Sequence, residues 1–187
     1  MNATNAECQW YVLFVKTGYE HKSVIEILRG WQEFDVRPFV PTRDYYFKHS
    51  GGGHWEKVRM FPGYVFVEST LTGIDFFVKT KPLIMRSDII YKPLRYLGVN
   101  SGEFVYEMKE EERNPLQKLF NYEYCIEKTC CFFEGDKIVF LSGAFEGFNG
   151  SIQNINLNKK RAVIDVKFMG EVRKVTVGLE LIEKLPL

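Results

Sequence analysis

The chain reads FEGDKIVFLSGAFEGFNGSI over residues 133–152. Glycines recur between the short apolar stretches of this segment, which is typical of β-strands joined by tight turns. Further turn signals follow at Asn158-Lys159, Gly170 and Gly178, so five strands fit between Glu134 and the end of the chain. Because closure covers the edges that a small lone sheet would expose, we expect a five-stranded β-barrel here.

Alternation within one predicted strand supports the barrel. Between Arg161 and Phe168, every second residue is apolar, so Ala162, Ile164, Val166 and Phe168 would share one face of the strand. Successive side chains of a β-strand point to opposite sides. The pattern therefore predicts one buried and one exposed face.

The N-terminal half mixes strand and helix signals. We predict a strand at Trp10–Val15, an amphipathic helix at Tyr19–Arg29, and a turn that leads into a buried strand over Phe61–Glu68. Between them, Arg37–Tyr46 and the glycines at 51–53 indicate a protruding β-hairpin. The order of elements favours an α+β fold, in which helices cover an antiparallel sheet.

Two more helices are expected after this sheet. We predict one around Asp75–Lys79 and another over Ser101–Arg113, which Asn114-Pro115 would end. We place a domain boundary after Arg113. The stretch 114–131 mixes aromatic and charged residues without a clear period, so it can be a linker or an ordered extension.

Composition excludes several classes of protein. The 187 residues are 45% apolar, the formal net charge is +1, and no apolar run is long enough to cross a bilayer. Met1–Gln9 lacks the order of a secretion signal, so we expect a cytoplasmic protein without a membrane partner. The four cysteines form no CxxC pair, so we expect neither a disulfide framework nor a metal site.

No enzyme signature is present. The glycines at 51–53 lack the lysine and the strand-to-helix context of a phosphate-binding loop, and no nucleophile elbow is found. His49 and His54 at a hairpin tip are poor metal ligands without a nearby cysteine. We therefore expect a binding protein without cofactor, and a monomer.

Four stretches of the chain resemble one family of proteins. Residues 133–152 are similar to a KOW motif, while Trp10-Tyr11-Val12, Pro38–Thr42 and Phe61–Val67 resemble the N-terminal (NGN) domain of the NusG family in order and spacing. The resemblance implies an NGN-like domain at 1–113, a linker or extension at 114–131, and an SH3-like KOW barrel at 132–187.

The resemblance also implies a partner. NusG proteins regulate transcription elongation, and their N-terminal domain binds the clamp helices of the large subunit of RNA polymerase. The matching motif positions are aromatic or apolar, which suits interface anchors. They are Trp10, Tyr11, Phe61, Pro62 and Tyr64. The alternative is that these residues only form the core.

Three sets of cations could contact nucleic acid. The first helix carries His21, Lys22 and Arg29, and the hairpin carries Lys48, His49, His54 and Lys57. The third set, in the predicted barrel, is Lys159, Lys160 and Arg161 with Lys167, Arg173 and Lys174. Together with an exposed aromatic such as Phe145 or Phe148, the third set could bind an RNA hairpin. The alternative for each set is an ordinary solvated face.

Within the family, Val12–Gly18 and Phe66-Val67-Glu68 are similar to LoaP-type processive antiterminators, which implies recruitment by a nascent RNA hairpin. Two alternatives stay open: a general NusG factor that couples polymerase to the ribosome or a termination factor, and a ribosome-associated KOW protein. Nontemplate DNA is a further candidate ligand. The glycines and the Val163–Val166 run oppose a switch of the barrel to helix, so we expect a permanent barrel.

Overall fold

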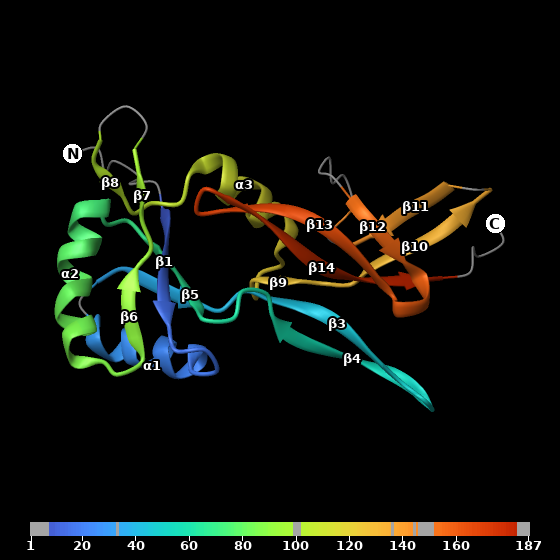
Figure 1. Cartoon of the computed structure of the whole chain (residues 1–187), viewed down its shortest axis with the longest axis horizontal. Helices are drawn as coiled ribbons and strands as arrows, with labels where there is room; N and C mark the ends of the chain where they lie inside the picture. Colours follow the sequence, from blue (N-terminus) through green and yellow to red (C-terminus); the bar gives the residue numbers. More distant parts are fainter. Residues whose placement is uncertain are drawn as a thin grey trace, which may run out of the picture. The chain divides into compact units, whose positions relative to one another are not determined.

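The computed structural model describes residues 8–32, 34–98, 102–135, 137–143, 145 and 152–182. By contacts the chain forms two compact units (Figure 1). Unit 1 contains Met1–Val40 and Phe61–Arg113, and unit 2 contains Pro41–Met60 and Asn114–Leu187. The hairpin at 42–59 therefore groups with the C-terminal part. The predicted division into domains at 113 and 131 stays a prediction.

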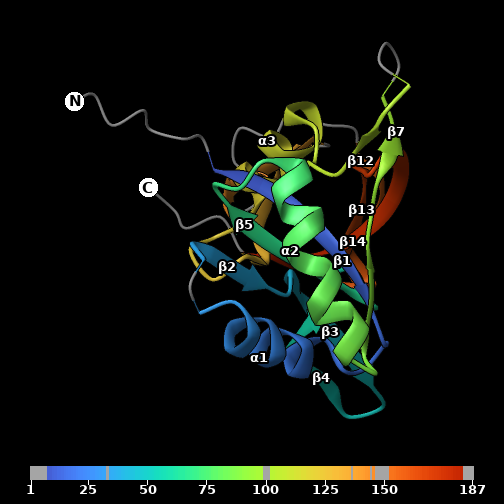
Figure 2. The same cartoon turned by 90° about the vertical axis from the view of Figure 1, so that its left-hand side faces the viewer.

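Unit 1 is built on a four-stranded antiparallel sheet. The strand order is β2 (Val36–Phe39), β5 (Tyr64–Ser69), β1 (Gln9–Val15) and β6 (Ile90–Pro93). The helix α2 (Gly73–Arg86) crosses in front of β1 in Figure 2, and α1 (Glu20–Gly30) lies below β2 in the same view. Tyr11, Leu13 and Val15 of β1 pack against Ile27 of α1 and Phe76 of α2 in the main core. This arrangement confirms the predicted helix-covered sheet.

The second helix is longer than the sequence indicated. It begins after Thr72, whose hydroxyl accepts a hydrogen bond from the backbone N–H of Asp75 at 3.3 Å, and continues through Pro82 to Arg86. Phe76 and Thr80 are buried one turn apart, so packing sustains the helix. The predicted segment Asp75–Lys79 lies within this helix.

The helix predicted over Ser101–Arg113 is wrong. Phe104–Val105 forms the short strand β8, which pairs with β7 (Tyr96–Leu97), and α3 begins at Glu110 and ends at Leu119. The glutamates at 110–112 stand in its first turn, where the helix dipole favours negative charge. Pro115 lies inside α3 instead of ending it.

Unit 2 combines the hairpin with a second sheet. Strands β3 (Thr42–His49) and β4 (Gly52–Arg59) form the predicted hairpin, and β9 (Cys125–Ile126) pairs parallel to β3 at Thr42 and Arg43. The five-stranded sheet has the order β11 (Lys137–Ser142), β10 (Thr129–Glu134), β14 (Glu171–Leu181), β13 (Arg161–Phe168) and β12 (Ile152–Asn156). Residues 114–131 hold most of α3, β9 and the start of β10.

The burial of β13 follows the predicted alternation. Ala162, Ile164, Val166 and Phe168 are buried, and the residues between them are half-buried or exposed. The α+β fold class with a five-stranded C-terminal sheet is thus confirmed. No helix in the described part of the chain is long and apolar enough to span a membrane.

Candidate protein and nucleic-acid interfaces

The face of the unit 1 sheet that points away from the main core carries an aromatic cluster. Trp10 meets Phe39 and Phe66 edge-on, with ring centroids 5.2 and 6.0 Å apart, and Phe61 stacks on Phe66 at 5.8 Å. The Trp10 Nε1–H donates to Glu68 Oε1 at 2.8 Å. All four rings are buried, so this cluster is a second core.

Three of the predicted partner-binding residues are therefore not accessible. Trp10 and Phe61 belong to the buried aromatic cluster. Tyr11 lies on the other face, stacked on Phe76 with centroids 3.9 Å apart, and its hydroxyl donates to the Leu71 carbonyl at 2.5 Å. Burial raises the pKa of Tyr11. The expectation that these three side chains contact a partner is corrected: Trp10, Tyr11 and Phe61 are buried by their neighbours in the fold.

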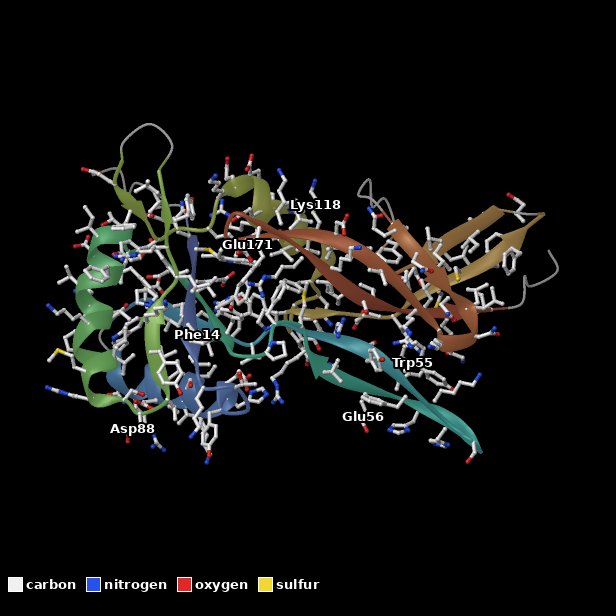
Figure 3. All side chains as sticks on the ribbon, in the orientation of Figure 1. Phe14, Trp55, Glu56, Asp88, Lys118 and Glu171 are labelled. Carbon is white, nitrogen blue, oxygen red and sulfur yellow. The ribbon has the colours of Figure 1, made fainter. Side chains whose placement is uncertain are left out.

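The other two predicted residues lie at the accessible end of the same sheet. Pro62 is exposed and Tyr64 is half-buried. Phe14 lies between two tyrosines, with its centroid 5.7 Å from Tyr64 and 5.4 Å from Tyr91, and Tyr91 is 44% exposed. Phe14 is labelled in Figure 3. We call Phe14, Pro62, Tyr64 and Tyr91 the aromatic row.

Phe14 and Tyr91 were missed by the sequence reasoning. Phe14 has the same strand parity as Trp10 and pairs with Tyr64 in the β1–β5 register, so alternation along β1 could have identified it. Tyr91 lies in the segment 81–98, to which the family resemblance does not extend. Its position follows only from the pairing of β6 with β1.

The turn that contains Pro62 is held in place by hydrogen bonds to its neighbour Gly63. The backbone N–H of Gly63 donates to the buried Glu20 carboxylate at 2.7 Å, and the N–H of Val15 donates to the Gly63 carbonyl at 2.8 Å. Hydrogen bonds to a buried charged group are stronger than those between neutral groups. Glu20 therefore ties the start of α1 to the aromatic row.

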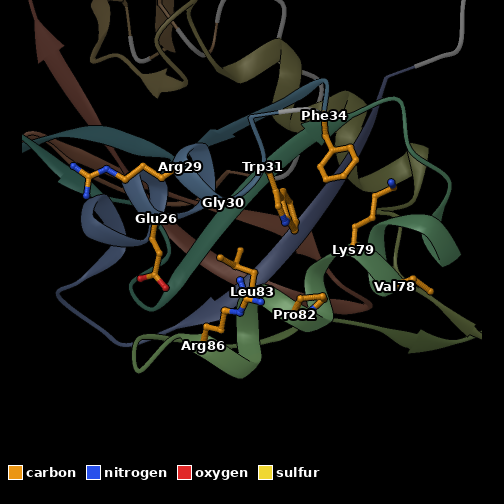
Figure 4. A pocket seen from close by; sticks show the side chains of 10 residues that line it. All are labelled: Glu26, Arg29, Gly30, Trp31, Phe34, Val78, Lys79, Pro82, Leu83 and Arg86. Atoms are coloured by element: carbon orange, nitrogen blue, oxygen red, sulfur yellow. The ribbon is translucent and has the colours of Figure 1, made fainter.

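The predicted cations of α1 do not gather at one place. His21 and Lys22 are exposed at the start of the helix, and Lys22 lies over the Tyr19 ring at 4.9 Å. Arg29 is seven residues beyond Lys22, which is about 10 Å along a helix. Arg29 instead lines a groove of about 610 Å3 between α1 and α2, together with Trp31 and Phe34 (Figure 4).

The six predicted cations of the barrel also separate. Lys159, Lys160 and Arg161 stand where the 3-10 turn η1 (Leu157–Lys159) enters β13. Lys167 is six residues further along β13, which is about 20 Å away. Arg173 and Lys174 pair with β13 near that far end, where Arg173 binds Glu171 at 3.2 Å and Lys174 stands opposite Asp165. The six cations therefore do not gather at one place, and their contact with nucleic acid stays a prediction.

The start of β13, at Arg161, contacts the hairpin formed by β3 and β4. Arg161 Nη1 donates to the Tyr45 hydroxyl at 2.6 Å, and Lys160 Nζ lies 4.8 Å from the centre of the Tyr46 ring. Lys48 Nζ donates to the Asn158 carbonyl at 3.4 Å. The turn therefore places three consecutive cations beside three consecutive aromatic residues, Tyr45 to Phe47.

These residues surround a pocket of about 380 Å3. Its lining consists of aromatic and cationic residues, and none of the described residues that line it is acidic. The lining residues are Tyr45, Tyr46, Phe47, Lys48, Lys159 and Arg161. We call this the edge pocket, because β9 pairs with β3 only at Thr42 and Arg43 and leaves this part of β3 without a second strand partner among the described residues. The aromatic side of the pocket was missed, since β3 and β13 are more than a hundred residues apart.

The hairpin is tightly packed on β14. A methyl group on Gly178 would collide with the Trp55 ring and approach the Asp44 carbonyl, so the sequence needs glycine there. Arg43 Nη1 donates to the Thr176 carbonyl at 2.5 Å, and the Lys128 N–H donates to Asp44 Oδ2 at 3.0 Å. Trp55 is labelled on the hairpin in Figure 3. This packing holds the two sides of the edge pocket together.

One predicted aromatic contact of the barrel is wrong. Phe145 is 2% exposed and packs edge-on against Phe140 with centroids 5.3 Å apart, so it cannot contact RNA. Its N–H donates to the Thr129 hydroxyl at 3.3 Å. Phe148 lies outside the described residues, as does most of the glycine-rich loop of the KOW-like segment.

Known proteins are similar to this chain over nearly its whole length. A profile described as "Transcription termination factor nusG" matches residues 8–117. The chain is 24% identical to the "Transcription termination/antitermination protein NusG" of Pseudomonas aeruginosa, with 95% of this chain and 98% of the relative covered. It is 26% identical to the protein of that name from Bacillus subtilis (strain 168), with 96% and 99% covered.

A solved structure titled "Domain interaction in Thermotoga maritima NusG" is similar in fold. The TM-score is 0.52 at 22% sequence identity, and the alignment covers 92% of this chain and 94% of that one.

Proposed function

The chain belongs to the NusG family of transcription factors, and on this basis we propose that it is a specialised antitermination factor, which binds RNA polymerase through unit 1 and nascent RNA through unit 2. The family is not enzymatic, so catalysis stays with the polymerase. A cytoplasmic location follows from the same proposal.

The polymerase contact is assigned to the aromatic row. Phe14, Tyr64 and Tyr91 offer ring surface that is partly open to solvent, and the hydrogen bond from Gly63 to Glu20 fixes the neighbouring turn. Aromatic residues on a rigid strand bury much area at small entropic cost. The clamp helices of the large subunit are the proposed partner. A factor that binds the closed, elongating state more tightly than the paused state shifts polymerase towards elongation.

The RNA contact is assigned to the edge pocket and its cations. The observation that carries this assignment is the meeting of Lys159–Arg161 with Tyr45–Phe47, because cations beside aromatic rings suit phosphates and unpaired bases. A hairpin in the transcript leader would then raise the local concentration of the factor at selected operons.

A general NusG role is the second candidate. The relatives that match over nearly the whole chain carry the general name "Transcription termination/antitermination protein NusG", which favours activity on every template. In that case the barrel would bind the ribosome or a termination factor. A purely ribosomal role has less support. The NusG family model matches residues 8–117, so the similarity to NusG extends well beyond the KOW-like segment.

Transcription in vitro separates the candidates. Purified protein is added to polymerase transcribing a terminator, on templates with and without the leader of the operon that contains its gene. The proposal expects increased readthrough only with the leader. Equal readthrough on both templates would support the general factor, and unchanged readthrough on both would remove antitermination. A template with mismatched strands tests nontemplate DNA. Its template strand encodes a changed leader RNA, while its nontemplate strand keeps the original leader sequence.

A further inference from the structure

The three rings of the edge pocket differ in what covers them. Tyr45 has the guanidinium groups of Arg43 and Arg161 at 5.7 and 5.6 Å from its centre, and Tyr46 has Lys160 at 4.8 Å. Phe47 is 39% exposed, whereas Tyr45 and Tyr46 are half-buried. Phe47 is therefore the ring of the three that offers the most exposed surface to a ligand.

The ring of Phe47 is supported by its neighbours. Tyr45 lies 4.9 Å from it on the same strand, and His54 of β4 stacks on it at 5.8 Å with an interplanar angle of 23°. Behind the pocket, a methyl group on Gly53 would collide with the Tyr46 ring, so glycine lets Tyr46 lie against the hairpin backbone. A supported aromatic surface loses little entropy when a ligand binds.

The charge around this ring suits a phosphate. Lys48, Lys159 and Arg161 contribute cations to the lining. The nearest carboxylate across the hairpin is Glu56, which stands opposite Tyr45 and contacts His54 Nε2 at 2.7 Å. This carboxylate contacts His54 and does not line the pocket, so the described residues of the lining include three cations and no carboxylate.

We propose that the edge pocket binds one unpaired nucleotide, with its base stacked on Phe47 and its phosphate held by Lys159 and Arg161. A base inside a duplex has both faces covered by its neighbours, whereas a loop base can stack on an aromatic side chain. The inference rests on the proposed RNA binding and adds that the loop of the hairpin, and not its stem, occupies the pocket. A displaced DNA strand offers the same chemistry, so the test includes it.

The test uses the full chain and three probes: an RNA stem with a uridine-rich loop, the same stem as a blunt duplex, and a DNA strand with the loop sequence. Wild type is expected to bind the stem-loop best. Phe47→Leu should weaken stem-loop binding about tenfold, since stacking on one aromatic side chain contributes on that scale, and leave duplex binding unchanged. Phe47→Tyr retains a ring and should restore the affinity. The matched control is Tyr122→Leu, an exposed aromatic of the same unit.

The outcomes distinguish a failure of the pocket assignment from a failure of RNA binding. If Phe47→Leu binds the stem-loop as well as wild type, or if Phe47→Tyr fails to restore binding, the pocket assignment is overturned while RNA binding by the cations stands. If the DNA strand binds better than the stem-loop and depends on Phe47, the pocket stands but its ligand is DNA. If wild type binds none of the probes, both proposals fail.

Discussion

Strands β1 and β3 each carry three aromatic residues, but two of those in β1 are fully buried, whereas all three in β3 are half-buried or exposed. β1 is an inner strand of the unit 1 sheet, and Trp10 and Tyr11 are covered on their two faces by separate clusters. β3 runs beyond its pairing with β9, and Tyr45 and Tyr46 are half-buried while Phe47 is exposed. How far each position is covered, more than the composition of the strand, decides whether an aromatic residue stabilises the fold or can face a ligand; Phe14 at the end of β1 is partly accessible although Trp10 and Tyr11 are buried.

The largest effect should come from the inner strand. Trp10→Ala removes a ring that is 1% exposed and leaves Glu68 without its indole donor, so the free energy of unfolding should fall by about 3–5 kcal/mol. Phe47→Ala, the matched change on β3, should cost less than about 1 kcal/mol because its ring is partly solvated. Urea denaturation measures both. Similar reductions for the two variants would contradict the comparison.

The next effect concerns the packing that holds β3. Gly178→Ala places a methyl group against Trp55, and overpacking of this kind costs about 1–3 kcal/mol. We expect a lower melting temperature and weaker RNA binding, because the two sides of the edge pocket move apart. Val172→Ala, an exposed change on the same strand, is the control. RNA affinity that survives Gly178→Ala would show that the hairpin is dispensable for binding.

Two triple variants that each remove three positive charges test the separation of the barrel cations. Replacing Lys159, Lys160 and Arg161 by alanine should weaken RNA binding at least about tenfold. The slope of the logarithm of the binding constant against the logarithm of the salt concentration should become shallower by about 0.7 for each phosphate that the variant no longer neutralises. Replacing Lys167, Arg173 and Lys174 should change the affinity little. Titrations at several salt concentrations measure this. Equal weakening by both triples would indicate non-specific attraction.

A smaller effect is expected at the aromatic row. Phe14→Ala should reduce the affinity for polymerase about fivefold to tenfold, as truncation of an interface anchor does, with little change in RNA binding. The control is Ile74→Ala, an exposed apolar residue on α2. Binding to immobilised polymerase measures both variants. The assignment fails if Ile74→Ala has the larger effect.

The smallest effect should come from an exposed ion pair of unit 2. Lys57 lies 2.6 Å from Glu123 and lowers the pKa of that carboxyl. A depressed folded-state pKa means that the pair stabilises the fold above the ordinary carboxyl pKa and ceases to do so as the pH falls through the folded value. Glu123→Gln should therefore differ only slightly from wild type in melting temperature near neutral pH, and not at all in strong acid. A large difference at neutral pH would mean that the hairpin depends on this pair.

The sequence was sufficient to predict the structure where a local pattern and the burial of the residues agree. Alternation predicted the buried face of β13, and the glycines at 51–53 predicted the hairpin tip. It failed where tertiary contacts override local signals: Pro115 lies within α3, and Phe145 is buried although its segment is rich in turn residues. The edge pocket was beyond sequence reasoning, because the contact of Arg161 with Tyr45 joins residues that no local pattern relates.

Photocrosslinking in a transcribing complex would locate both surfaces at once. Benzoylphenylalanine replaces Phe47, Tyr64 or Tyr122 in turn, and the complex is irradiated while the leader RNA emerges. We expect position 47 to crosslink to RNA, position 64 to the large subunit of polymerase, and position 122 to neither. Crosslinks from position 47 to polymerase alone, or from position 64 to RNA alone, would contradict the assignment of the two surfaces.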